Sequence, residues 1–113
     1  LHKKLVFMIN TDKINEITSR IANNFNSDKI ILFGSYVSGN QNDDSDLDLL
    51  IIQDSDLPKH KRGLDIRMSL RGLMIPMDIL IYTNSEFESE KNIKNSFLNS
   101  AIKNSKILYE RSK

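Results

Sequence analysis

Residues 33–52, FGSYVSGNQNDDSDLDLLII, carry the pattern that decides the fold. The stretch opens at the end of one apolar run, KIILF at 29–33, and closes on another, DLDLLII at 46–52. Short apolar runs bounded by turn residues predict buried strands, so we expect a strand at each run. Between the two runs GSYVSG has to turn, because glycine favours tight backbone conformations, and the polar NQNDDS extends the loop.

Outward from these two strands, helical patterns lie on both sides. Residues 11–26 predict a helix with Thr11 as its N-cap. Their apolar side chains recur at helical spacing, namely Ile14, Ile17, Ile21, Ala22 and Phe25. A loop at 54–58 leads into a helix from Pro58 to about Leu73, whose buried face is formed by Ile66, Leu70, Leu73 and Met74. Residues 64–70 also alternate as a strand would, so that interpretation stays open.

The last part of the chain predicts a third strand and a further helical region. PMDILIYT at 76–83 is the strand, with proline tolerated at its first position. Asn84 or Ser85 then caps the helical region, whose expected core contacts are Phe97, Leu98, Ala101, Ile102 and Leu108. This order of elements is typical of an α/β domain, with a small mixed sheet flanked by helices. Since the chain has no repeat or linker, we expect residues 1–113 to form a single domain.

Length and composition limit the class of protein. The chain has 113 residues, enough to bury a core, and its lack of cysteine excludes thiolate metal sites and cysteine nucleophiles. A net charge of +1 does not favour nucleic acid as a direct substrate. No apolar stretch approaches the roughly 20 residues that cross a bilayer, and residues 1–10 lack the pattern of a signal peptide. We therefore expect a cytoplasmic location and no membrane partner.

Three aspartates on two of the expected strands point to a metal site. Side chains alternate along a strand, so Asp46 and Asp48 point to one face, about 7 Å apart. Asp78 stands between apolar residues of the third strand, where an aspartate calls for a partner. If the two strands are neighbours, one site for Mg²⁺ or Mn²⁺ explains all three carboxylates, because hard oxygen ligands suit these ions.

The Gly-Ser turn supplies the second half of the candidate site. Gly34 lets the backbone bend and approach a ligand closely, and Ser35 offers a hydroxyl. The amides that follow can form an anion-binding turn or a helix start, and Gly39 permits a second tight turn. A phosphate-binding turn beside three carboxylates predicts nucleotidyl transfer, with two metal ions about 4 Å apart orienting the hydroxyl and stabilising the leaving pyrophosphate.

Other polar residues have simpler explanations. Turn-rich loops favour aspartate, which accounts for residues 43–44 without any function. KHKR at 59–62 is compatible with phosphate binding, but a solvated helix face is the commoner explanation. Tyr36 either flanks a nucleotide or packs behind the loop. His2 and His60 lack metal-ligand spacing, so we expect neither to bind a metal.

Taken together, these motifs resemble the DNA polymerase β-like nucleotidyltransferase superfamily. The resemblance lies in LFGSYVSG, in the DLD of DSDLDLLI, and in the later aspartate of PMDILIYT. Ten residues lie between Ser35 and Asp46, the first aspartate of DLD. The small size resembles the minimal nucleotidyltransferases (MNT type), which are often paired with a HEPN-domain protein as toxin and antitoxin. The resemblance implies the minimal polymerase β-like fold over most of the chain.

The family's site residues carry over onto matching positions of this sequence. The resemblance implies that the metal ligands and catalytic residues are Asp46, Asp48 and Asp78, and that the nucleotide-binding residues are Gly34, Ser35, Ser38 and Gly39. Relatives often have arginine where Ser38 stands. That departure implies weaker nucleotide affinity, or a phosphate contact supplied instead by Lys59, Lys61 or Arg71.

The implied activity is transfer of AMP from ATP to a hydroxyl, with two Mg²⁺ ions as cofactors. By the same resemblance, the acceptor is a side chain, with tyrosine the best candidate, on a HEPN-family RNase toxin. The chain would then be an antitoxin in a hetero-oligomer. Two alternatives stay open: a binding-only antitoxin with a vestigial site, and a small-molecule nucleotidyltransferase of the aminoglycoside type.

Overall fold

The computed structural model of the protein describes residues 9–42 and 44–112. The expectations for His2 and Asp43 and for residues 1–8 fall outside the described residues. The helices and strands are α2 (Thr11–Asn24), β1 (Lys29–Phe33), α3 (Ser35–Ser38), β2 (Leu47–Ile52), α4 (Leu64–Leu70), β3 (Met77–Tyr82), α5 (Asn84–Glu90), α6 (Phe97–Lys103) and β4 (Lys106–Glu110), together with the 3₁₀ turns η1 (Lys59–Lys61) and η2 (Arg71–Leu73).

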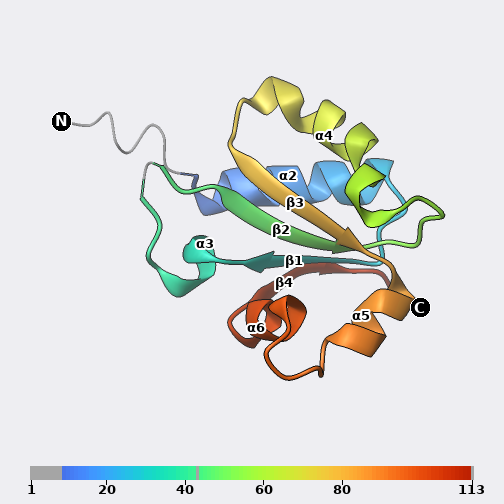
Figure 1. The fold of residues 1–113 in the computed structure, drawn as a ribbon. Coiled ribbons are helices and arrows are strands. Elements are labelled where there is room, and N and C mark those ends of the chain that lie inside the picture. Colours follow the sequence, from blue (N-terminus) through green and yellow to red (C-terminus); the bar gives the residue numbers. More distant parts are fainter. Residues whose placement is uncertain (1–8, 43, 113) are drawn as a thin grey trace.

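The described strands form one mixed sheet in the order β3–β2–β1–β4 (Figure 1). β2 runs parallel to β3, whereas β1 runs antiparallel to both β2 and β4. The prediction of a small mixed sheet flanked by helices is confirmed, and the three expected strands lie within one residue of their expected bounds. Within the described residues, no helix is both long enough and apolar enough to span a bilayer.

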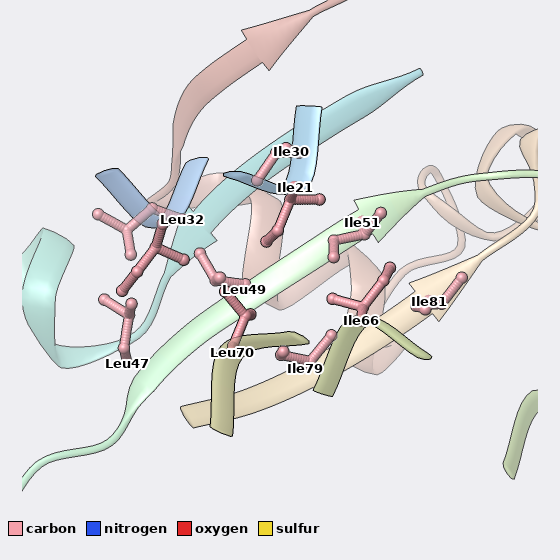
Figure 2. Packing of buried hydrophobic residues seen from close by; sticks show 11 residues of the cluster. Ile21, Ile30, Leu32, Leu47, Leu49, Ile51, Ile66, Leu70, Ile79 and Ile81 are labelled. Carbon is pink, nitrogen blue, oxygen red and sulfur yellow. The ribbon is translucent and has the colours of Figure 1, made fainter. Parts of the chain in front are cut away.

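Helices cover both faces of the sheet (Figure 1). On the face that we call the α2 face, Leu47, Leu49 and Ile51 of β2 pack with apolar residues of α2 and α4 (Figure 2). On the opposite α6 face, Leu50 and Ile52 pack with apolar residues of α5 and α6. Because side chains alternate along β2, Asp48 belongs to the α6 face.

The start of α2 differs from the expectation by one residue. Asn10, rather than Thr11, is the N-cap, and its Oδ1 accepts a hydrogen bond of 2.9 Å from the amide of Lys13. Asparagine and threonine both suit this position, so the sequence alone did not distinguish two adjacent candidates.

The start of α5 is also capped one residue earlier than expected. Thr83, not Asn84 or Ser85, is the N-cap, and it forms a capping box with Glu86. The Thr83 hydroxyl accepts from the Glu86 amide at 3.1 Å, and a Glu86 carboxylate oxygen accepts from the Thr83 amide at 2.9 Å. The spacing of threonine and glutamate is the sequence signal that the expectation overlooked.

The single helix expected from Pro58 to Leu73 is instead broken into η1, α4 and η2. Gly63, with φ of +84°, separates η1 from α4, and Met74, with φ of +55°, ends η2. Ile66 and Leu70 are buried as expected, but Met74 is 87% exposed, so its assignment to the core is wrong. The alternative of a strand at 64–70 is also wrong.

The last helical region contains a strand that the sequence interpretation missed. After α6, β4 pairs with β1 at the edge of the sheet, and Leu108 lies on this strand rather than on a helix. Leu98 is buried as expected, whereas Phe97 is 52% exposed. Asn104 and Ser105 separate the two elements, and the β-branched and aromatic residues of KILYE favour a strand.

Candidate active site

Asp48 and Asp78 lie side by side because β2 and β3 are parallel neighbours. The two residues are direct partners in the register, and adjacent strands are about 4.8 Å apart. Asp46 directly precedes β2, two residues before Asp48, and its charge acts on Asp48. The strand pairing on which the three-aspartate hypothesis depended is therefore present.

The surroundings of Asp48 disfavour its charged form. Partial burial raises the pKa of the Asp48 carboxyl above its usual value, and the negative charges of Asp78 and then Asp46 raise it further. None of the ion pairs among residues 9–42 and 44–112 involves these three carboxylates. A bound cation would offset this electrostatic cost.

Gly34 provides the space that the Asp48 carboxylate occupies. Its backbone has φ of +79° and ψ of −154°, a conformation open almost only to glycine. A Cβ at this position would overlap Oδ2 of Asp48 and would stand 3.0 Å from its Cγ. The turn and the aspartate strand therefore meet at this point, and no other residue type fits it without displacing the carboxylate.

The residues expected to bind the nucleotide lie together on one turn, which is the single-turn helix α3 between two glycines. Gly39 ends the helix with φ of +82°, and its amide donates to the carbonyl of Ser35 at 3.0 Å. The exposed Ser38 donates through its hydroxyl to the carbonyl of Gly34 at 3.4 Å. Tyr36 packs against the core of the α2 face, so it lies behind the loop.

The sequence argument from the burial of Asp78 is wrong. Asp78 is exposed, because the start of β3 is not covered on its α6 face, so apolar neighbours in the sequence do not bury it. Its position beside Asp48 is the observation that links it to the site.

The carboxylates of Asp46, Asp48 and Asp78 are suitable ligands for a divalent metal, both in their chemistry and in the positions of their backbones. Within the described residues, no three His, Cys, Asp or Glu side chains already stand at metal-binding geometry. Asp46 and Asp78 are exposed, so their carboxylates have room to rotate toward the partly buried Asp48. Carboxylate oxygens on adjacent strands are the ligands that Mg²⁺ prefers, and the neighbouring charges favour a cation.

Lys59 and Arg71, two of the side chains suggested to contact phosphate in place of an arginine at Ser38, lie in different places. Nζ of Lys59 lies 3.9 Å from the ring centre of Tyr82, four residues and about 13 Å along β3 from Asp78, so it is at the far end of the sheet. The same end includes Arg62, which is buried and forms a bidentate pair with Glu86 at 2.6 and 3.1 Å. Arg71, by contrast, lines a surface cavity together with Pro76 and Met77, directly before Asp78.

Sequence reasoning missed an aromatic pair that begins on the β1 side of Asp48. Phe33 is the register partner of Asp48 on β1, opposite the side where Asp78 lies. Phe97 of α6 packs edge-on against Phe33, with ring centroids 5.8 Å apart and planes at 82°. The position of Phe33 directly before the Gly-Ser turn could have indicated that it lies at the site. Nothing in the sequence indicated that Phe97 packs against it.

A glycine turn against paired strand aspartates on a small mixed sheet defines a protein of the nucleotidyltransferase class. Residues 15–113 match the family described as "Polymerase beta, Nucleotidyltransferase". The match covers most of the chain, so the protein belongs to this family, as a minimal, polymerase β-like member. The family resemblance seen in the sequence is thus confirmed.

Solved structures with the same fold include two informative examples. One, with a TM-score of 0.60 and 20% identity over 91% of this chain and 75% of the other, is described as a toxin-antitoxin with AMP-PNP. Another, a candidate nucleotidyltransferase from Sulfolobus solfataricus, has a TM-score of 0.51 and 21% identity over 87% of this chain and 78% of the other. At these identities the similarity supports the fold alone. No curated protein matches the chain.

Proposed function

We propose that this chain is a Mg²⁺-dependent nucleotidyltransferase that serves as an antitoxin. It transfers AMP from ATP to a hydroxyl, best assigned to a tyrosine, on a HEPN-family RNase toxin. The observation that carries the proposal is the meeting of Gly34, Asp48 and Asp78 in a chain of this family. A toxin-antitoxin solved with AMP-PNP has a similar fold, and we infer the nucleotide and the kind of partner by analogy with it.

In the proposed site, Asp46, Asp48 and Asp78 hold the metal, and the Gly34–Gly39 turn holds the β- and γ-phosphates. Magnesium bound there supplies charge neutralisation and lowers the pKa of the acceptor hydroxyl. The partly buried Asp48, whose carboxyl has a raised pKa and no cationic partner among the described residues, gives the strongest preference for such an ion.

The reaction follows from these positions. The acceptor oxygen attacks the α-phosphorus and forms the new O–P bond, while the bond from that phosphorus to the α,β-bridging oxygen breaks and pyrophosphate leaves. The carboxylate of Asp78, exposed on the edge strand β3, receives the proton of the acceptor hydroxyl. Since the chain itself forms no covalent intermediate, its contribution is positioning and charge neutralisation.

The test is the intact mass of the co-purified partner protein after incubation with this chain, Mg²⁺ and ATP. We expect added mass in steps of one AMP, absent with an Asp46→Ala, Asp48→Ala variant. Asp56→Ala is the matched control, because Asp56 is exposed and lies in the loop after β2, and it should leave the addition intact.

Two results would replace the proposal by another function. If none of the four nucleoside triphosphates adds mass although the complex is stable, the chain is a binding-only antitoxin. If a purified aminoglycoside is modified without any protein partner, the chain is a small-molecule enzyme.

A further inference from the structure

A cavity of about 290 Å³ lies beside the Gly34 turn, on the α6 face of the sheet. One wall comes from the end of β1 and the turn, and the other from α6. The lining residues that matter for its chemistry are Phe33, Gly34, Ser38, Phe97, Ser100 and Asn104. This volume is near the lower end for small-molecule sites, so it suits part of a nucleotide rather than all of it.

The cavity continues from the candidate active site. Phe33 pairs in register with Asp48, so it occupies the neighbouring place on the same sheet face. Asp78 lies on the other side of Asp48, which puts the cavity on the side away from Asp78. A nucleotide whose α-phosphate sits at Asp48 therefore has this cavity within its reach.

The lining of the cavity disfavours phosphate and favours a flat apolar group. None of the residues that line it carries a charge. Phe97 is 52% exposed, and its perpendicular contact with Phe33 holds the ring while leaving half of the residue's surface open. An exposed aromatic ring stacks well on a base, because every base presents a π-face.

Polar groups for reading a base stand on the same side of α6. Phe97 and Ser100 lie three residues apart on one face of α6, and Asn104, the C-cap residue that follows the helix, lines the same cavity. In the part of the chain that the structure describes, the side chains of Ser100 and Asn104 make no hydrogen bond. The amide of an asparagine offers one donor and one acceptor side by side, the pattern that pairs with the edge of adenine.

We propose that this cavity binds the nucleobase of the nucleoside triphosphate, with Phe97 stacking on the base and Asn104 selecting adenine. This inference rests on the proposed function, because it places the base relative to phosphates bound at the Gly34 turn. It goes further by naming the residues that choose the nucleotide.

The experiment compares two probes, ATP and inorganic tripolyphosphate, each titrated calorimetrically with Mg²⁺ into the folded chain. Phe97→Ala should weaken ATP binding by about 5- to 100-fold and leave tripolyphosphate binding unchanged, because only ATP has a base to stack. Phe97→Leu, which keeps apolar volume in the cavity but removes the ring, should show most of the same loss. Ile93→Ala is the control, because Ile93 is similarly exposed, at 53%, and does not line the cavity.

Base selection is measured by repeating the titration with GTP, CTP and UTP. Asn104→Ala should reduce the preference for ATP over the other three nucleotides by about 5- to 100-fold. If Phe97→Ala and Phe97→Leu bind both probes as tightly as the unaltered chain does, the cavity assignment is wrong while the proposed function stands. If the unaltered chain binds neither probe, the proposed function and the cavity assignment both fail.

Discussion

Substitution of Gly34 by alanine tests the link between the turn and the aspartate strand. The backbone conformation at Gly34 costs about 1–3 kcal/mol for any residue with a Cβ. In addition, the new Cβ would overlap Oδ2 of Asp48 and lie 3.3 Å from its Cβ. Because Oδ2 is the tip of a side chain, we expect the carboxylate to rotate away. Gly34→Ala should therefore lose both stability and the metal-binding position of Asp48.

Gly39 supplies a matched control on the same turn. It too has a positive φ, of +82°, but a Cβ added there would meet no heavy atom within 4 Å. Gly39→Ala should cost about 1 kcal/mol through backbone strain alone and leave the Asp48 carboxylate in place. At about 4 °C per kcal/mol for a chain of this size, Gly34→Ala should melt roughly 4–12 °C below the unaltered protein.

The assay has two parts. Thermal unfolding gives the stability of both alanine variants, and paramagnetic Mn²⁺ titration gives the affinity of the site for a divalent ion. We expect weakened Mn²⁺ binding in Gly34→Ala only. A double variant with Asp48→Ala should recover part of the stability, because the overlap with the carboxylate is then removed. Equal stability losses in the two glycine variants, with Mn²⁺ binding unchanged in both, would refute the reasoning.

Three further predictions concern the charge of Asp48, the backbone strain at Met74 and the ion pair between Arg62 and Glu86. Asp48→Asn should raise the melting temperature of the metal-free protein by about 1–4 °C at pH 7, because like charges on paired strands destabilise. Because folding raises the pKa of Asp48, the stability of the unaltered protein should fall as pH rises from about 3.8 through the raised pKa. A pH series of melting curves should show this fall in the unaltered protein and not in Asp48→Asn. Met74→Gly should leave stability unchanged or add up to about 1 kcal/mol in urea unfolding, since Met74 is exposed at positive φ, whereas Met68→Gly inside α4 should lose about 1 kcal/mol. Glu86→Gln should cost about 1–2 kcal/mol at pH 7 in urea unfolding, because Arg62 loses its charged partner. The hydrogen bond from Arg62 lowers the pKa of Glu86 to about 2, so this stability is present above about pH 4.5 and lost as pH falls through 2, where variant and parent should converge.

The pattern of the sequence predicted the strands and the aspartate pair because both depend on local periodicity. The alternation at 46–52 placed Asp46 and Asp48 on one face, and the apolar run around Asp78 predicted a strand, but the sequence argument took the pairing of these two strands only as a condition, which the structure meets. The burial of Asp78 could not be predicted in this way, because exposure depends on which helices cover the start of β3. The strand β4 was missed for a similar reason, since its pairing partner β1 lies more than 70 residues earlier in the chain.

The distribution of charge around the turn explains why both a metal and a base-binding cavity would matter to this chain. Ser38 gives the turn no positive charge, and Lys59 lies at the opposite end of the sheet. Arg71 lines a cavity with Met77 and Ile79, which belong to the α2 face, whereas Asp78 lies between them on the opposite, α6 face. A triphosphate at this turn would therefore meet three carboxylates and few cationic side chains, which disfavours binding in the absence of a divalent ion. Under these conditions an uncharged contact, such as the proposed stacking on the exposed Phe97, would add affinity that does not depend on a cationic side chain at the turn. The binding energy would then depend on which base the nucleotide carries.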